Sequence, residues 1–258
     1  MNRNWTDVYY DACTFYSWEP QHLRKPPRKS PSEDREALLR KTLKRKEVPL
    51  NHVLDFLFML GAERLVIEIV AEAIGEKWSD TFYLAGRNHE ERYSLPVNSV
   101  QTDFTFEGNE HLISMEMKVG AKTDSIQLAK YLYFHAIAER LGERPRRHAL
   151  IYLGPGSWST LWRDKRDLSY EARLEEAVQN APEKIGRDQQ RVDVAELKKM
   201  AAQIKLGYLS YGQLAEILKS VAEDVDRQSW EGGVAIRLLD GVIGDLQERE
   251  LIYGSGVK

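Results

Sequence analysis

Two carboxylates and a lysine occur at a spacing that would let them act together on a phosphate ester. Asp103 lies in the segment Thr102–Glu107, and Glu116 and Lys118 lie in the segment Leu112–Val119. Both segments alternate apolar and polar residues as strands do, and the four residues between them (GNEH) suit a hairpin loop. We therefore predict a β-hairpin that carries three chemically active side chains.

The register of this hairpin decides which side chains share a face. With a four-residue loop, Glu107 lies opposite Leu112 and Asp103 lies opposite Glu116. Because side chains alternate between the faces of a strand, one face is predicted to be buried and the other polar. The buried face carries Phe104, Phe106, Ile113, Met115 and Met117, and the polar face carries Asp103, Thr105, Ser114, Glu116 and Lys118. Two opposed carboxylates repel unless a cation lies between them, so the polar face predicts a metal site. The alternative is a salt-bridged strand face exposed to solvent.

The segment after the hairpin is predicted to be a helix that brings two more polar side chains to this face. Thr123 or Asp124 is a suitable N-cap, and apolar residues at helical spacing continue to about Leu141. Gln127 and Tyr131 lie one helical turn apart and therefore on one side of the helix. They contribute to the site unless they are simply a flank of the helix.

These residues resemble the motif of the PD-(D/E)XK nuclease superfamily. The matching residues are Thr102-Asp103, Glu116-Met117-Lys118 and Gln127-Leu128-Ala129-Lys130-Tyr131. They are similar to the branch with a QxxxY helix, which includes RecB-like and uncharacterised defence-type nucleases. Thr102 replaces the proline that usually precedes the aspartate. The resemblance covers roughly residues 55–155, and its specificity lies in the joint spacing, because an ExK tripeptide alone is common.

The resemblance implies a nuclease that uses Mg²⁺ or Mn²⁺ to hydrolyse phosphodiester bonds, with DNA favoured over RNA. Asp103, Glu116 and the main-chain carbonyl of Met117 would hold the metal ion. Lys118 would orient the attacking water or stabilise the developing negative charge.

Further residues are assigned through the same resemblance. Gln127 would join the catalytic set, and Tyr131 would contact the nucleic acid. The family usually adds a glutamate from the helix before the hairpin, for which the candidates are Glu63, Glu68 and Glu72. We favour Glu63, because the residues that follow it resemble the opening of that helix in the family.

Two basic clusters are candidates for contacts with nucleic-acid phosphates. Residues 22–47 contain more Lys and Arg than Asp and Glu, with Lys44 and Arg45 among them, and Arg144, Arg146 and Arg147 form a second cluster. Either cluster is equally compatible with a solvated basic surface. The net charge of −3 and the pI near 6.1 argue mildly against a general polyanion binder.

The pattern of elements predicts an α/β fold. Residues 147–153 are nearly all apolar, as in a central strand buried on both faces, and they complete a βαβ unit with the preceding helix. The order α-β-β-β-α-β is also the core that the resemblance implies: a restriction-endonuclease-like mixed sheet flanked by helices. We expect an N-terminal arm and basic helix (1–48), the nuclease core (49–160), and a mostly helical extension packed on the core (161–258).

The remaining elements are predicted from caps, periodicity and helix breakers. Aromatic side chains of the N-terminal arm are expected to pack on the body of the protein. The predicted helices span about 30–47 (ended by Pro49), 50–76 (with a break or kink at Gly61), 170–180, 193–204, 211–225 and 234–249, and the predicted strands span 78–84 and 205–210.

Composition narrows the class of protein. The 258 residues are 42% hydrophobic and 30% charged, which is enough for one large domain or a domain with an appendage. Cys13 is the only cysteine, so no internal disulfide forms, which fits a reducing compartment. No targeting segment is visible, and charges interrupt the apolar stretch 50–75, so we expect a cytoplasmic protein with no membrane partner.

Other chemistries lack their motifs. The six histidines are scattered without zinc-ligand spacing, and no GxSxG motif is present. Two further functions stay open: a catalytically inactive nuclease-fold adaptor or nucleic-acid-binding module, and an interaction protein whose acidic face is a structural salt-bridge cluster. A homodimer or a partner protein is compatible with these functions, although nothing in the sequence fixes an interface.

Overall fold

The computed structural model describes residues 4–15, 47–85, 102–142, 145–181 and 192–252; for residues 11–15 and 61–63 it describes the backbone alone. The chain divides into two compact units. One unit comprises Met1–Leu57 and Ala215–Lys258, and the other comprises Phe58–Leu214. The candidate chemistry falls entirely within the second unit.

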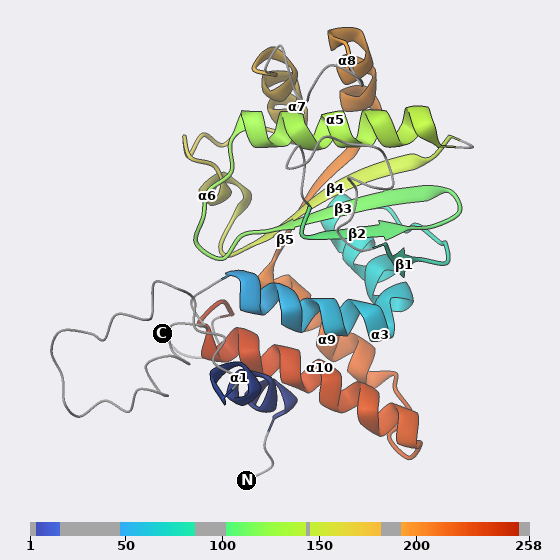
Figure 1. Ribbon diagram of the computed structural model, residues 1–258, viewed down its shortest axis with the longest axis vertical. Coiled ribbons are helices and arrows are strands. Elements are labelled where there is room, and N and C mark those ends of the chain that lie inside the picture. Colours follow the sequence, from blue (N-terminus) through green and yellow to red (C-terminus); the bar gives the residue numbers. More distant parts are fainter. Residues whose placement is uncertain (1–3, 16–46, 86–101, 143–144, 182–191, 253–258) are drawn as a thin grey trace, which may run out of the picture. The chain divides into compact units, whose positions relative to one another are not determined.

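The unit Phe58–Leu214 is built on a five-stranded sheet (Figure 1). In order across the sheet, the strands are β1 (Tyr83–Leu84), β2 (Phe104–Glu107), β3 (His111–Met117), β4 (Arg147–Gly154) and β5 (Lys205–Ser210). β1, β2 and β3 are antiparallel neighbours, whereas β3, β4 and β5 run parallel. This open mixed sheet, with helices on its flanks, confirms the predicted α/β class.

The β2–β3 hairpin has the register that the sequence predicts. Phe104 pairs with Met115, and Glu107 pairs with Leu112. Every residue of both strands is nevertheless buried, on the polar face as well as on the apolar face. The hairpin therefore lies inside the sheet, with helices over both of its faces.

Two helices provide this cover. The apolar face packs on α3 (Glu47–Ile74), where the ring of Phe58 meets Phe104 and Phe106 edge to face at 5.1 and 5.0 Å between centroids. The opposite face packs on α5 (Ser125–Leu141), whose buried side chains form one apolar cluster with Leu112 and Tyr152 of the sheet. Cover on both sides explains why β4 is almost continuously apolar.

α5 begins where the sequence predicts. Asp124 is its N-cap, and the Asp124 side chain accepts a hydrogen bond from the Gln127 amide. The helix joins β3 to the parallel strand β4 and so completes the predicted βαβ unit. After β4 the chain forms α6 (Trp158–Leu161), α7 (Tyr170–Gln179) and α8 (Val194–Gln203) before it returns as β5 at the edge of the sheet.

Two predicted boundaries are wrong. α3 is continuous through Pro49 and Gly61. Pro49 lies in its first turn, where the missing amide hydrogen would have no helical partner in any case. The strand predicted over 78–84 shrinks to Tyr83–Leu84, because Asp80 instead caps the hairpin loop and accepts bonds from the amides of Asn109 and Glu110 at 2.9 and 2.8 Å. The helix predicted over 30–47 lies almost wholly outside the described residues.

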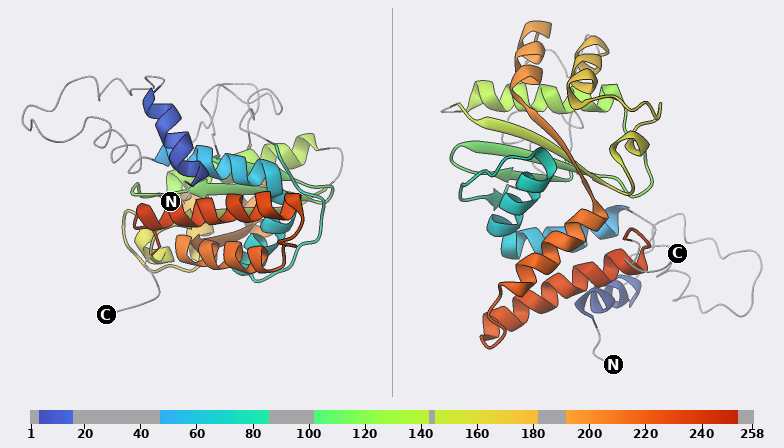
Figure 2. Two further views of the ribbon diagram at one scale, coloured as in Figure 1. Left: turned by 90° about the horizontal axis from the view of Figure 1, so that it is seen from below. Right: turned by 180° about the vertical axis from the view of Figure 1, so that it is seen from behind.

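The other unit is helical in its described part. It holds α1 (Trp5–Phe15), the first part of α3, most of α9 (Tyr211–Glu223) and α10 (Trp230–Glu248), with α1 packed across α10 (Figure 2). The indole of Trp5 donates to the Leu238 carbonyl at 3.2 Å, so an N-terminal aromatic side chain does pack on the rest of the unit. Over the described ranges, no helix has the length and apolar content needed to cross a membrane.

Gly207 provides a test of the packing of α3 against the edge strand. A Cβ atom at Gly207 would lie 2.7 Å from the Ile74 side chain and 2.8 Å from the Ala73 carbonyl oxygen, a main-chain atom that no side-chain rotation can move aside. We predict that Gly207→Ala lowers the free energy of unfolding by roughly 1–3 kcal/mol, measured by urea denaturation. Gly120→Ala is the control, because nothing lies within 4 Å of its Cβ position, and equal stability of the two variants would contradict this packing.

Candidate active site

The residues singled out from the hairpin and from α5 meet around one carboxylate. Oε1 of Glu116 accepts hydrogen bonds from Nζ of Lys118 at 2.6 Å and from Nε2 of Gln127 at 2.9 Å. Nε2 of Gln127 also donates to the Tyr131 hydroxyl at 3.0 Å. Four residues that the sequence predicted to cooperate are thus joined directly by hydrogen bonds.

Asp103 approaches this group from β2. Its Oδ2 atom accepts a hydrogen bond from the main-chain amide of Met117 at 2.7 Å, so its carboxylate lies beside the end of β3. The negative charge of Asp103 acts on Glu116 strongly enough to raise the pKa of that residue. The predicted opposition of the two carboxylates across the hairpin is therefore present.

The site is buried. The side chains of Lys118 and Glu116 are only 8% and 6% exposed, because α5 lies over this face of the sheet. A solvated, salt-bridged strand face does not describe these residues. Burial also strengthens the electrostatic interactions between these side chains, since a poorly solvated ion interacts strongly with its neighbours.

Electrostatics leave Glu116 with an unusual proton affinity. The pKa of Glu116 is raised from 4.5 to about 7, first by burial and then by the charge of Asp103, whereas Lys118 and Tyr131 act in the opposite direction. Burial, together with the charge of Glu116, also raises the pKa of Tyr131 well above its usual value. The site thus holds more negative charge than Lys118 balances.

Thr123 belongs to the site, although the sequence indicated it only as a possible helix cap. Its hydroxyl donates to Oε1 of Gln127 at 3.0 Å, which turns the amide nitrogen of Gln127 toward Glu116 and Tyr131. Thr123 is fully buried and forms an isolated parallel bridge with Trp162. This pairing joins segments far apart in the sequence, and no local sequence pattern predicts it.

The glutamates of α3 make their contacts elsewhere. The carboxylate of Glu68 lies 3.7 Å from Nζ of Lys77, and Glu72 accepts a hydrogen bond from Gln213 at 2.8 Å. Glu63 lies within α3, but its side chain is outside the part of the chain that the structure describes. No described contact therefore joins a glutamate of α3 to the site.

Of the second predicted basic cluster, the described members Arg146 and Arg147 lie at the end of the sheet remote from Glu116. Arg147 pairs with His111 at the start of β3, whereas Glu116 is near the end of that strand, roughly 16 Å away at the usual rise per residue. Arg146 is 11% exposed and lies 3.5 Å from the Glu107 carboxylate. Lys44, Arg45 and Arg144 fall outside the described residues.

Oxygen donors are available for a metal ion. Over the described ranges, no group of three or more His, Cys, Asp or Glu side chains is placed to hold one. The candidate donors are instead two carboxylates, Asp103 and Glu116, and the main-chain carbonyl of Met117, a set that suits a hard divalent cation. Two carboxylates beside one lysine leave a net negative charge when both are ionised, so the residues fit such an ion.

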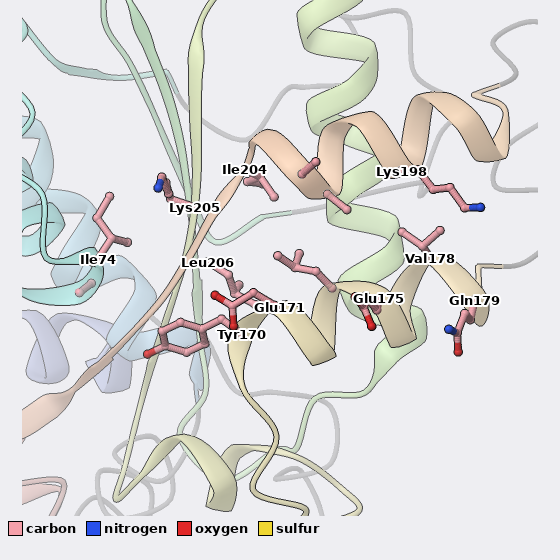
Figure 3. Close-up of a pocket in the computed structure, with 14 residues that line it drawn as sticks. Ile74, Tyr170, Glu171, Glu175, Val178, Gln179, Lys198, Ile204, Lys205 and Leu206 are labelled. Carbon is pink, nitrogen blue, oxygen red and sulfur yellow. The ribbon is translucent and has the colours of Figure 1, made fainter.

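A separate hollow of about 740 Å³ lies between α7, α8 and β5 (Figure 3). Tyr170, Leu174, Val178 and Leu206 are among its lining residues, and none of the candidate site residues lines it. The chemistry points to the hairpin instead.

Comparison with known proteins gives no relatives: protein-family models, curated proteins and solved structures contain no match to this chain. Any function must therefore be argued from the residues and geometry of the site. The fold by itself does not decide it, since one fold serves many functions.

The raised pKa of Glu116 predicts a pH-dependent stability in metal-free protein. Between about pH 4.5 and 7 the folded state keeps a proton on Glu116 that the unfolded state has lost, so this residue's contribution to stability falls as pH rises. Glu116→Gln removes that dependence. The unfolding free energy of the variant, relative to that of the wild type, should therefore increase between pH 5 and pH 8, measured by denaturation in EDTA.

The control for this measurement is Glu110→Gln, which removes a carboxylate from the exposed hairpin loop. Its stability should follow the wild type at every pH. Parallel profiles for Glu116→Gln and the wild type would contradict the assignment of a raised pKa to Glu116.

Proposed function

We propose that this protein is a metal-dependent nuclease of the PD-(D/E)XK type that hydrolyses phosphodiester bonds, with DNA as the favoured substrate. One observation carries the proposal: a buried lysine and two carboxylates meet at the end of an antiparallel hairpin. Gln127 and Tyr131 complete the group from the next helix. This is the combination that the motif requires.

The order of elements supports the same proposal. α3, the strands β1, β2 and β3, then α5 and β4 follow one another as α-β-β-β-α-β, with β1 to β3 antiparallel and β4 parallel to β3. A restriction-endonuclease-like core has this order. Motif and topology are separate observations, and each alone would be weak.

The residues have distinct tasks in this proposal. Asp103, Glu116 and the Met117 carbonyl would hold Mg²⁺ or Mn²⁺. Such an ion lowers the pKa of a bound water and neutralises charge on the phosphate. The ammonium group of Lys118, fixed 2.6 Å from Glu116, is held where it orients a nucleophile or stabilises the developing oxyanion.

Gln127 and Tyr131 act through Glu116. Nε2 of Gln127 donates to the carboxylate, and Tyr131 hydrogen-bonds to the same residue. Both bonds favour the ionised form of Glu116, which is the form that coordinates a cation. Thr123 keeps the Gln127 amide in the required orientation.

A second candidate is a nucleic-acid-binding module that keeps the nuclease fold without catalysis. The observation that favours it is the 2.6 Å ion pair between Lys118 and Glu116, which gives each side chain a partner of opposite charge without any ligand. A buried pair of this kind also serves as a purely structural element. The two candidates differ in whether bound DNA is cut.

Cleavage of labelled single- and double-stranded DNA tests the proposal. We predict cutting in Mg²⁺ or Mn²⁺ and none in EDTA. Lys118→Met and Asp103→Asn should each lower the rate about 100-fold or more, because each removes a charge from the reacting centre. Glu110→Gln, an exposed carboxylate of the same hairpin, should cut as the wild type does.

Two outcomes would contradict the assignment. Undiminished cutting by both site variants would mean that another site does the chemistry. DNA binding without any cutting, in a correctly folded protein with either metal, would favour the non-catalytic module.

A further inference from the structure

Two exposed cations lie on segments that the structure ties to the start of α5. Lys122 belongs to the loop between β3 and α5, and Arg163 follows α6. We propose that Arg163 and Lys122 bind the phosphodiester backbone of DNA at the candidate site. This inference rests on the proposed function and names the surface that holds its substrate.

The two cations are positioned by a short ladder. The Thr123 amide donates to the Leu161 carbonyl at 3.0 Å, and the Arg163 amide donates to the Thr123 carbonyl at 3.1 Å. Thr123 and Trp162 at the centre of this ladder are 0% and 1% exposed. The backbone beneath both cations is therefore anchored in the core.

The charged side chains beside this ladder are open to solvent. Thr123 and Trp162 are buried, whereas the adjacent Lys122 and Arg163 are exposed and Asp124 is half-buried. The Arg163 side chain is 71% exposed, and Lys122 is exposed as well. A fixed backbone with a solvated cation is preorganised to meet a ligand.

Asp124 connects this surface to the candidate site. Its Oδ2 atom lies 3.1 Å from Nη1 of Arg163, and its Oδ1 accepts the Gln127 amide at 2.9 Å. The side chain of Gln127 in turn donates to Glu116. Arg163 is thus linked to the reacting carboxylate by consecutive contacts.

The ion pair of Arg163 is easily exchanged for a phosphate. An exposed ion pair contributes little to stability, whereas guanidinium binds phosphate through two parallel hydrogen bonds. Two other arginines of this unit are buried in structural ion pairs instead. Arg146 is 11% exposed against Glu107, and Arg173 is 1% exposed against Asp164 and Glu176.

Lys122 supplies a second, more adaptable cation. Its ammonium group donates to the Thr160 carbonyl, an exposed contact that a flexible side chain gives up readily. The surplus negative charge of Asp103 and Glu116 repels a polyanion. Cations beside the site are therefore needed to hold the phosphates that flank the one attacked.

Binding of a fluorescein-labelled DNA duplex, followed by anisotropy in EDTA over a range of salt concentrations, tests the inference. Arg163→Gln should weaken binding about five- to tenfold at about 0.1 M salt and reduce the slope of log K against log salt by about 0.9. The double variant Lys122→Gln/Arg163→Gln should reduce the slope by about twice as much.

Arg140→Gln is the matched control. Arg140 is 38% exposed and pairs with the carboxylate of Glu196, as Arg163 pairs with Asp124, but it lies in the last turn of α5, at the opposite end of that helix. Its removal should leave both the affinity and the salt slope unchanged. Thermal unfolding of each variant verifies that the protein is folded.

The outcomes separate this inference from the proposed function. Unchanged binding by Arg163→Gln, equal losses in Arg163→Gln and Arg140→Gln, or no DNA binding by the wild type would each overturn it, whatever the cleavage assay gives. Binding that depends on Arg163 in a protein that never cuts DNA would uphold this surface and reject the nuclease.

Discussion

The Glu116 carboxylate is held under α5, out of water, and the other features of the site follow from this constraint. A buried carboxylate must be protonated, hydrogen-bonded or paired with a cation. Lys118 and Gln127 both direct their donors to the same oxygen of Glu116, yet its pKa still rises to about 7. Asp103 adds to the surplus of negative charge. A site with this imbalance has a physical reason to take up a divalent cation.

The sequence was sufficient to predict those features that depend on residues close together in the chain. A period of two and a four-residue loop fix the register of the β2–β3 hairpin, so the pairing of Phe104 with Met115 was predictable. The N-cap at Asp124 was predictable for the same reason, because its side chain bonds within its own turn. The two carboxylates and the lysine were found together because one hairpin carries all three.

Nonlocal pairing was not predictable. Nothing near Thr123 in the sequence indicates its bridge to Trp162, and this bridge brings Arg163 beside the start of α5. The direction of β4 determines where the predicted basic cluster at its start lies. Since β4 runs parallel to β3, Arg147 at the start of β4 lies at the end of the sheet remote from Glu116. Alternation predicts the face of a residue, whereas its end of the sheet depends on topology.

Calorimetric titration of Mn²⁺ near pH 7, in two buffers of different ionisation enthalpy, tests the central claim directly. If Asp103 and Glu116 hold a cation, the wild type binds Mn²⁺ at a single site and releases protons, because Glu116 must give up its proton to coordinate the ion. Asp103→Asn then loses most of that binding. Mn²⁺ binding of equal strength in the variant, or binding without proton release, would contradict the account.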